Sequence, residues 1–333
     1  MILRRIGNEI HVTTPAKLNL FLEVLARRSD GYHDVQTVMV AIDRFDSVCC
    51  RASSTMDLEV ECAWAPGLTS QPQGAAGSAY DVLPASADNL VAKALRKLRD
   101  QSGRRDGLHC RITKRIPSAA GLGGASSDAA AALLAANALW GSPLSGEDLE
   151  RFSGELGSDI PFFVRGSRAA VARGRGEQVE PCACPAMLHV VVVRPPEGLS
   201  TAAVYQRCKP AEVPVSAEPL LQAMASGDVV AMGRSLFNRL QEPACQLSPW
   251  IERLQRIFAG LPCLGHQMSG SGSSYFGLFR NRSMASRAAQ FLRGRQVGAV
   301  FQATAAIGFE SQVGRTSRSG DGVGQRGRLA SHL

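Results

Sequence analysis

The sequence predicts a protein of mixed α and β structure with two packed domains. Its 333 residues are enough for two domains with substantial cores. Apolar, β-branched runs such as residues 187–193 are typical of buried strands, whereas the alanine-rich stretch 129–139 is typical of a helix. From residue 187 onwards, strand patterns alternate with helix patterns, which suits an α/β sandwich.

The first half of the chain combines strands with three helices. Strand patterns cover residues 10–24, 35–42, 47–52 and 108–116, and helix patterns cover residues 88–99, 129–139 and 144–156. Asp88 is placed to cap the first of these helices. Ser145 is placed to cap the third, with Asp148 three residues on, close to a capping box. Residues 66–84 are rich in Gly, Ser, Gln and Ala, which predicts an exposed insertion.

The second half repeats strands and helices around a second glycine-rich loop at residues 270–274. Strands are predicted over 187–193, 266–269, 275–279 and 298–305, and helices over 201–207, 215–224, 229–236, 249–260 and 284–292. A Pro- and Cys-rich joint near residue 183 separates the domains, which we place at 1–183 and 184–311. Residues 312–333 are basic and rich in Gly and Ser, so their composition predicts a disordered tail.

Composition narrows the classes of function. With 45% hydrophobic and 20% charged residues, the chain reads as a soluble globular protein. No apolar run approaches the roughly 20 residues that span a bilayer, and no signal peptide is evident, so we expect a cytoplasmic protein without a membrane partner. The nine cysteines form no CxxC pair, which favours reduced thiols; Cys182 and Cys184 lack a second ligand pair at zinc spacing, and we assign no metal ligands.

The net charge of +8 raises the possibility of a nucleic-acid partner. Residues 314–333, however, hold four arginines against one aspartate. The excess positive charge on the rest of the chain fits an anionic small-molecule substrate at least as well as a polynucleotide. We therefore expect no nucleic-acid partner.

The most informative motif is a glycine-rich turn between the predicted strand 108–116 and the predicted helix 129–139. It reads Pro117-Ser-Ala-Ala-Gly-Leu-Gly-Gly-Ala-Ser-Ser-Asp128. Glycine lets the backbone approach an anion, and the unpaired N–H groups of a helix start point at it. The motif lacks the Lys-Ser/Thr ending of a P-loop, and a plain turn with a serine N-cap remains the alternative.

Two further segments accompany this turn: Pro15-Ala-Lys17-Leu-Asn19, and the late loop Ser269-Gly-Ser-Gly-Ser-Ser274. Together the three resemble the GHMP kinase superfamily, which includes galactokinase, homoserine kinase and mevalonate kinase. Residues 15–22, 27–37, 156–163 and 172–177 are most similar to its 4-diphosphocytidyl-2-C-methyl-D-erythritol kinase family. The resemblance covers residues 8–310.

The resemblance implies an α+β fold, with an N-terminal ribosomal-protein-S5-like α/β domain and a C-terminal ferredoxin-like α/β sandwich. It implies ATP-dependent phosphorylation of the 2-hydroxyl of 4-diphosphocytidyl-2-C-methyl-D-erythritol in non-mevalonate isoprenoid biosynthesis, with Mg²⁺. A monomer or weak homodimer is expected. A homoserine- or mevalonate-type kinase and a non-catalytic nucleotide-binding protein remain alternatives.

The resemblance also assigns roles to particular residues. Asp159 and Lys17 become the catalytic pair, because a carboxylate can accept the hydroxyl proton and a lysine can stabilise the phosphate charge; a structural salt bridge is the alternative. Tyr32 and His33 become readers of the cytidine base, by stacking and hydrogen bonding. Asn19 and Thr201 are assigned to the methylerythritol end.

On the nucleotide side, the resemblance implicates Lys114 and Asn89 beside the turn; a solvated strand-end lysine and a helix cap are the respective alternatives. The turn residues assigned to the triphosphate are Pro117, Ser118, Ala119, Ala120, Gly121, Leu122, Gly123, Gly124, Ala125, Ser126 and Ser127. Ser127 is also a candidate ligand for Mg²⁺.

Overall fold

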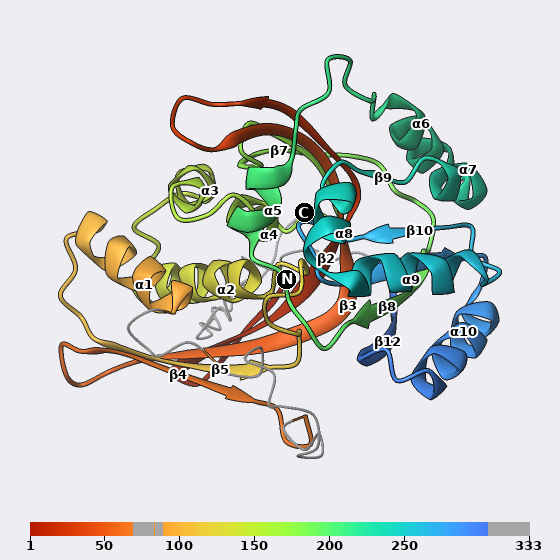
Figure 1. Cartoon of the computed structure of the whole chain (residues 1–333). Helices are drawn as coiled ribbons and strands as arrows, with labels where there is room; N and C mark the ends of the chain where they lie inside the picture. Colours follow the sequence, from red (N-terminus) through yellow and green to blue (C-terminus); the bar gives the residue numbers. More distant parts are fainter. Residues whose placement is uncertain (69–82, 84–88, 306–333) are drawn as a thin grey trace, which may run out of the picture.

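The computed structural model describes residues 1–68, 83 and 89–305, which form two sheets with helices packed against them (Figure 1). The first sheet follows the order β1-β2-β3-β5-β4, with β6, β7 and β9 attached beside this path. Its strands are β1 (Ile2–Ile6), β2 (Glu9–Arg27), β3 (His33–Ala52), β4 (Leu58–Trp64), β5 (Leu108–Lys114), β6 (Ala169–Arg173), β7 (Gln178–Pro181) and β9 (Phe237–Asn238).

Strands β2 and β3 are the longest strands among the described residues, at 19 and 20 residues. Their pairing is interrupted by irregularities between Pro15 and Ala16, between Asn19 and Phe21, and between Val24 and Ala26. Such bulges bend and twist a strand pair. The prediction of two separate strands over 35–42 and 47–52 is wrong, because β3 continues through residues 43–46, three of which are charged.

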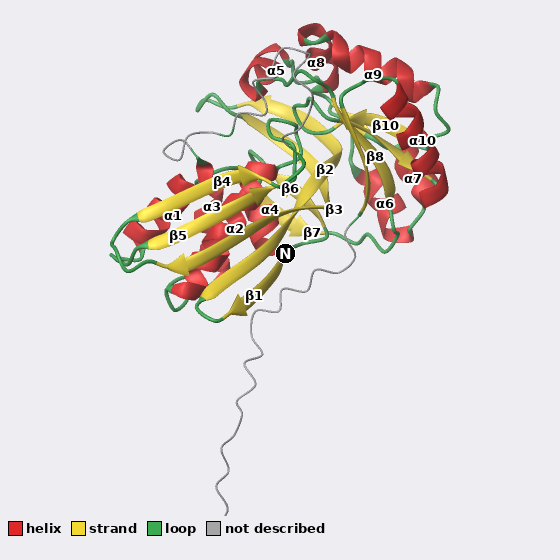
Figure 2. Ribbon diagram, turned by 90° about the horizontal axis from the view of Figure 1, so that it is seen from below, coloured by secondary structure: helices red, strands yellow, loops and turns green. Residues whose placement is uncertain are grey.

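Four helices cover one face of the first sheet (Figure 2): α1 (Leu90–Gln101), α2 (Gly124–Leu139), α3 (Gly146–Gly154) and α4 (Ile160–Arg165). The central helix α2 contacts β2, β3 and α1, and its small alanine side chains allow this close approach. Ser145 caps α3 as predicted, accepting from the Asp148 N–H at 3.1 Å. Asn89 caps α1, accepting from the Val91 N–H at 2.9 Å, while Asp88 lies outside the described residues.

The second sheet is antiparallel throughout, in the order β10-β11-β8-β12. Its strands are β8 (His189–Arg194), β10 (Gly265–Met268), β11 (Tyr275–Phe279) and β12 (Ala299–Thr304). The accompanying helices are α5 (Thr201–Arg207), α6 (Glu218–Ser226), α7 (Val229–Arg234), α8 (Gln241–Leu247), α9 (Pro249–Ala259) and α10 (Arg282–Gly294). This strand order is that of a ferredoxin-like unit and confirms the expected C-terminal fold.

The two sheets share a core. Leu18 and Leu20 of β2 pack in one cluster with Val190 and Val192 of β8, and β9 adds a short parallel pairing to β2. The chain changes sheet between β7 and β8. The predicted insertion at 66–84 falls almost entirely outside the described residues, as does all of the predicted tail at 312–333. Within the described ranges, no helix is long and apolar enough to cross a membrane.

Candidate active site

Two cavities meet at the glycine-rich turn. The larger has a volume of about 770 Å³ and reaches from the turn to Tyr32 and α5. The second, of about 530 Å³, lies between the turn, Asn89 and Lys114. Residues that line both cavities are Ala119, Gly121, Gly123 and Ser126. The turn therefore lies between two cavities whose walls share these four residues.

The turn is held in place by the late glycine-rich loop. The Ser269 hydroxyl donates to the Gly121 carbonyl at 3.0 Å, and the Ser274 N–H donates to the Ala120 carbonyl at 3.1 Å. Gly121 has a positive φ of 70°, and a Cβ there would lie 2.1 Å from the Ser269 carbonyl oxygen. Glycine is therefore required at this contact for both conformation and space.

Helix α2 begins directly in the turn. Its N-cap is Gly123, in the left-handed conformation and without a side-chain cap, so the alternative of a serine N-cap is wrong. The helix starts at Gly124, so Ser126, Ser127 and Asp128 lie at its N-terminal end, ahead of the alanine-rich stretch 129–139. The N–H groups of an uncapped first turn are available to an anion, and the helix dipole favours negative charge there.

The two serines of this first turn differ in exposure. Ser126 lines both cavities, whereas the Ser127 side chain is fully buried. The Ser127 hydroxyl donates to the Pro15 carbonyl at 2.6 Å and is bonded to the Thr14 hydroxyl. Ser127 therefore anchors α2 to β2, and its hydroxyl already has partners within the protein. A contact of Ser127 with phosphate or Mg²⁺ stays a prediction.

Lys17 and Asp159 come together beside the turn. Lys17 is 3% exposed, and its Nζ lies 3.4 Å from Asp159 Oδ2 and 2.6 Å from Asn19 Oδ1. The Lys17 N–H donates to the Leu122 carbonyl at 3.0 Å, which ties β2 to the turn. Asp159 is the N-cap residue of α4, but its side chain makes no capping bond and is 33% exposed. Its carboxylate is therefore accessible to a substrate in the larger cavity.

Asn19 positions this pair. Its amide oxygen accepts from Lys17, and its amide nitrogen donates to the Thr37 hydroxyl at 2.8 Å. Thr37 in turn donates to the Phe21 carbonyl at 2.7 Å. This chain of hydrogen bonds fixes the direction of the Lys17 ammonium group. Asn19 also lines the cavity, so its predicted contact with the methylerythritol end stays a prediction.

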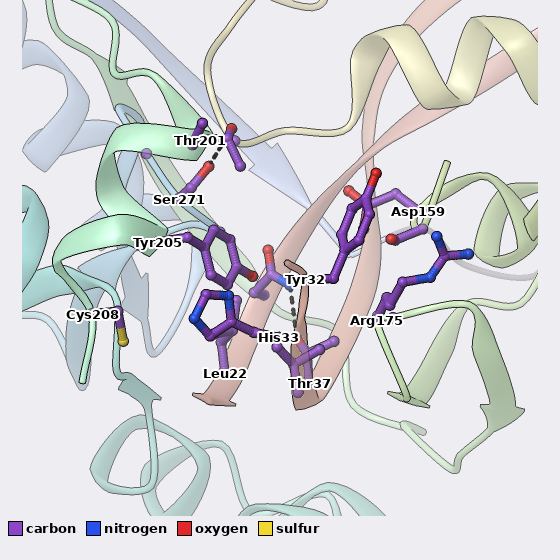
Figure 3. A pocket seen from close by; sticks show the side chains of 18 of the residues that line it. Leu22, Tyr32, His33, Thr37, Asp159, Arg175, Thr201, Tyr205, Cys208 and Ser271 are labelled. Carbon is purple, nitrogen blue, oxygen red and sulfur yellow. Dashed lines mark hydrogen bonds between the residues drawn. The ribbon is translucent and has the colours of Figure 1, made fainter. Parts of the chain in front are cut away.

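Aromatic rings form the far end of the larger cavity (Figure 3). The His33 ring packs against Tyr205, with 5.2 Å between ring centroids, and burial lowers the pKa of His33. Tyr32 is 56% exposed, and the Arg175 guanidinium lies 5.1 Å from the centre of its ring. Tyr205 and Arg175 were not predicted as site residues, although Arg175 lies within the 172–177 motif.

Thr201 is the first residue of α5, and its hydroxyl lies 2.8 Å from that of Ser271 in the late loop (Figure 3). This contact joins α5 to the late loop at the wall of the larger cavity. The structure therefore brings Lys17, Asn19, Asp159 and Thr201 to one cavity with Tyr32 and His33, as a shared substrate site requires.

Lys114 and Asn89 line the smaller cavity, but their polar groups already have partners within the protein. Lys114 is 4% exposed and pairs with Asp46 and, at 2.6 Å, with Asp128, so it is not a solvated strand-end lysine. Burial alone would lower the pKa of Lys114, but the Asp128 and Asp46 carboxylates outweigh burial and raise it. Asn89 acts as the helix cap. Contacts of either residue with a nucleotide stay a prediction.

The chain is similar to known kinases along most of its length. The models for the N-terminal and C-terminal domains of the GHMP kinases match residues 89–167 and 220–297. A 4-diphosphocytidyl-2-C-methyl-D-erythritol kinase of Brevibacillus brevis is 35% identical over 287 residues, which cover 86% of this chain and 92% of that protein. The corresponding protein of Pelotomaculum thermopropionicum is 39% identical over 79% of this chain and 86% of its own length.

Solved structures of kinases also resemble this chain. A 4-(cytidine 5'-diphospho)-2C-methyl-D-erythritol kinase is 32% identical and superposes with a TM-score of 0.70, covering 90% of this chain and 100% of its own. A homoserine kinase from Cytophaga hutchinsonii, at 19% identity, covers 91% of this chain and 96% of its own with a TM-score of 0.67, and shares the fold. The chain is a kinase and belongs to the 4-diphosphocytidyl-2-C-methyl-D-erythritol kinase family of the GHMP kinases.

Proposed function

We propose that this kinase transfers the terminal phosphate of ATP to the 2-hydroxyl of 4-diphosphocytidyl-2-C-methyl-D-erythritol. The products are the 2-phosphate and ADP, and the reaction belongs to the non-mevalonate route to isoprenoid precursors in the cytoplasm. The observation that carries the proposal is the meeting of two cavities at the glycine-rich turn, with Lys17 and Asp159 beside it. One compartment is suited to the phosphate donor and the other to the acceptor.

The turn suits a triphosphate. Its glycines leave no side chain between the backbone and a ligand, and the uncapped start of α2 offers N–H donors. The smaller cavity continues from the turn towards Cys62, Leu83 and Leu90, which provide apolar surface for a nucleobase. We therefore place the nucleoside in the smaller cavity, with the phosphates running along the turn towards Gly123 and Ser126.

Lys17 and Asp159 then act where the two compartments meet. Phosphoryl transfer has a loose transition state, so the protein contributes mainly by positioning groups and stabilising charge. Asp159 orients the acceptor hydroxyl and accepts its proton as the new O–P bond forms. Lys17, held by Asn19, stabilises the negative charge on the oxygens between donor and acceptor.

Magnesium, when bound with ATP, neutralises charge on the phosphate oxygens. It prefers oxygen ligands and keeps several waters, so it needs few protein groups. Ser126 and Asp159 present oxygens to the larger cavity and would hold the ion there. Ser126 lines both cavities, which leaves its hydroxyl accessible for this role.

The aromatic end of the larger cavity suits the cytosine base of the acceptor. Tyr32 and Tyr205 offer ring faces for stacking. His33 follows Tyr32 in the sequence, packs against the Tyr205 ring and supplies a hydrogen-bonding group. A neutral imidazole can both donate and accept a hydrogen bond. The methylerythritol end would then lie towards Asn19 and Thr201, near the catalytic pair.

The test is ATP consumption measured in parallel with the cytidine substrate, homoserine and mevalonate at matched concentrations. We expect turnover with the cytidine substrate to exceed that with either other alcohol by several orders of magnitude. Faster turnover of homoserine or mevalonate would instead identify another GHMP kinase activity. No turnover with any of the three would contradict the proposed acceptor.

A further inference from the structure

A cluster of three potential metal ligands lies on the first sheet, away from both cavities. Glu9 and His11 are two residues apart on β2, and Cys49 lies directly opposite His11 on β3. The His11 Nε2 atom lies 2.9 Å from Glu9 Oε2 and 3.6 Å from Cys49 Sγ, and Cys49 Sγ lies 3.3 Å from Glu9 Oε2. All three side chains thus point to a common position.

We propose that Glu9, His11 and Cys49 bind one divalent transition-metal ion, with Zn²⁺ as the best match. Zinc takes sulfur, nitrogen and oxygen ligands at about 2.3, 2.0–2.1 and 2.0–2.2 Å in tetrahedral geometry. Those bond lengths place any two ligand atoms about 3.4–3.6 Å apart. The three observed separations are within about half an ångström of these values, so an ion fits with small side-chain adjustments.

The site is accessible and built on rigid elements. Its neighbours Ile10, Val12 and Cys50 point the other way, into the core under α2. Glu9, His11 and Cys49 therefore share the sheet face opposite the helices (Figure 2), where the Glu9 and His11 side chains are 31% and 38% exposed. Both strands lie inside the sheet, with β1 and β5 as outer neighbours. The backbone register thus fixes the ligand spacing without a loop.

Binding would require one proton to leave. The hydrogen bonds from Cys49 and His11 lower the pKa of Glu9, so its carboxylate is ionised at neutral pH. Burial and the Glu9 charge raise the pKa of Cys49 to about 11, so its thiol is protonated without a metal. The ion would form a Zn–S bond as the S–H bond breaks, and the proton would pass to solvent. Water would complete the fourth coordination position.

Two arginines oppose a cation at this position. Arg111 of β5 is in register with Cys49, and Arg4 of β1 is in register with His11. Arg111 is also in register with Glu61 of β4, which offers it an alternative anionic neighbour. These positive charges should weaken binding without preventing it. The same feature provides a sharp test, because removal of the Arg111 charge should tighten binding of the metal.

The metal site would affect the stability of the first sheet rather than the rate of phosphoryl transfer. His11 precedes Lys17 by six residues of β2, about 20 Å of strand. A metal bound there would link β2 to β3 and stabilise the folded state in proportion to its occupancy. The kinase assay with Mg²⁺-ATP should be unaffected by loss of the site.

The experiment is titration of metal-free, reduced protein with Co²⁺ as a spectroscopic probe, followed by displacement with Zn²⁺ measured by calorimetry. We expect one ion per chain, a thiolate-to-cobalt absorption band and release of about one proton. Cys49→Ser and His11→Ala should weaken zinc affinity by more than the roughly 10- to 100-fold that loss of an outer-shell partner costs. Arg111→Gln should strengthen it.

Two control variants identify binding elsewhere. His109→Ala removes a neighbouring histidine that pairs with Glu61 at 3.3 Å, and Cys182→Ser with Cys184→Ser removes two thiols two residues apart in the sequence. Both should bind zinc like the unaltered protein. Absence of the thiolate band, or a band that survives Cys49→Ser, would overturn the proposal. Retained melting temperatures of the metal-free variants would establish that these variants fold.

Discussion

Two buried lysines, Lys17 and Lys114, flank the glycine-rich turn, and they differ in the number and burial of the carboxylates that they contact. A Cβ on Gly123 would lie 3.0 Å from Lys17 Cγ, and a Cβ on Gly124 would lie 3.3 Å from Lys114 Nζ. Lys17 faces a single carboxylate, Asp159, across 3.4 Å at the edge of a cavity. Lys114 contacts two carboxylates, Asp46 and Asp128, that are themselves buried.

This difference separates a chemical role from a structural one. The Lys17 ammonium can exchange Asp159 for phosphate oxygens at little cost, because Asp159 is partly solvated. Lys114 cannot give up a carboxylate without leaving a charge buried and unpaired, which is costly. Asp46 also accepts from the N–H groups of Arg115 and Ile116, just before the turn. Lys114 and its partners therefore fix the start of the turn, while Lys17 is available for the proposed role in the reaction.

Asp159→Asn should give the largest effect on catalysis. Asparagine keeps the size of the side chain and one acceptor oxygen but cannot accept the hydroxyl proton, so kcat should fall by about 10²- to 10⁴-fold. ATP affinity and the melting temperature should remain unchanged. Steady-state kinetics and nucleotide titration check this. A variant with near-normal kcat would mean that Asp159 only forms a salt bridge with Lys17.

Lys114→Met should mainly reduce stability, because it leaves two carboxylates buried without their cation. The free energy of unfolding should drop by about 3–5 kcal/mol, measured by urea denaturation. The matched variant Lys17→Met should reduce kcat with a smaller loss of stability. If Lys114→Met left stability intact and abolished ATP binding, the contrast between the two lysines would be reversed.

The elements that were predicted best are those with local signals. Ser145 caps its helix through a contact only three residues away, and α5 begins and ends as its pattern predicts. The long strand β3 was predicted as two strands, because residues 43–46, which include Asp43, Arg44 and Asp46, interrupt the β-branched pattern. Asp46 is instead fully buried, and its cation, Lys114, lies 68 residues away in sequence. The local sequence pattern around Asp46 gives no sign of a partner so distant in the sequence.

The site was predicted from motifs, and the contacts that motifs do not show again depend on distant partners. Lys17 and Asp159 were paired through their resemblance to a family, and the structure places them in contact. Ser127 was assigned to the phosphates through the family resemblance, because a hydroxyl can hydrogen-bond phosphate. Its direction is set by the helical rotation from Gly124, which turns it towards Thr14 and Pro15. Tyr205 was missed because one tyrosine in a short helix resembles a core residue.

Tyr32→Ala should affect the acceptor side of the turn alone. Loss of a stacking face costs about 1–3 kcal/mol, so the KM for the cytidine substrate should rise by about 5- to 150-fold. The KM for ATP should not change, because the proposed nucleotide site lies on the other side of the turn. Tyr32→Phe retains the ring and serves as the matched control. Equal effects on both KM values would contradict the division of the two cavities between the substrates.

The smallest expected effect is a pH dependence of acceptor binding through His33. Burial lowers the pKa of this histidine, and Arg27 adds to the shift, so the ring stays neutral below the ordinary value of about 6.5. If the neutral His33 ring binds cytosine, the affinity for the acceptor is fully present above pH 6.5. It is lost as the pH falls through the lowered pKa of His33. The acceptor KM, measured at saturating ATP, should therefore be flat from pH 8 to about 6.5 and rise below it.

His33→Gln provides the control for this pH effect, since glutamine can hydrogen-bond but does not titrate in this range. It should raise the acceptor KM modestly at pH 8 and remove its rise at low pH. Titration of the ATP phosphates would instead change the KM for ATP in both proteins, which separates the two causes. A rise in acceptor KM that persists in His33→Gln would assign it to a group other than His33. The cytosine end of the cavity would then need a different reader.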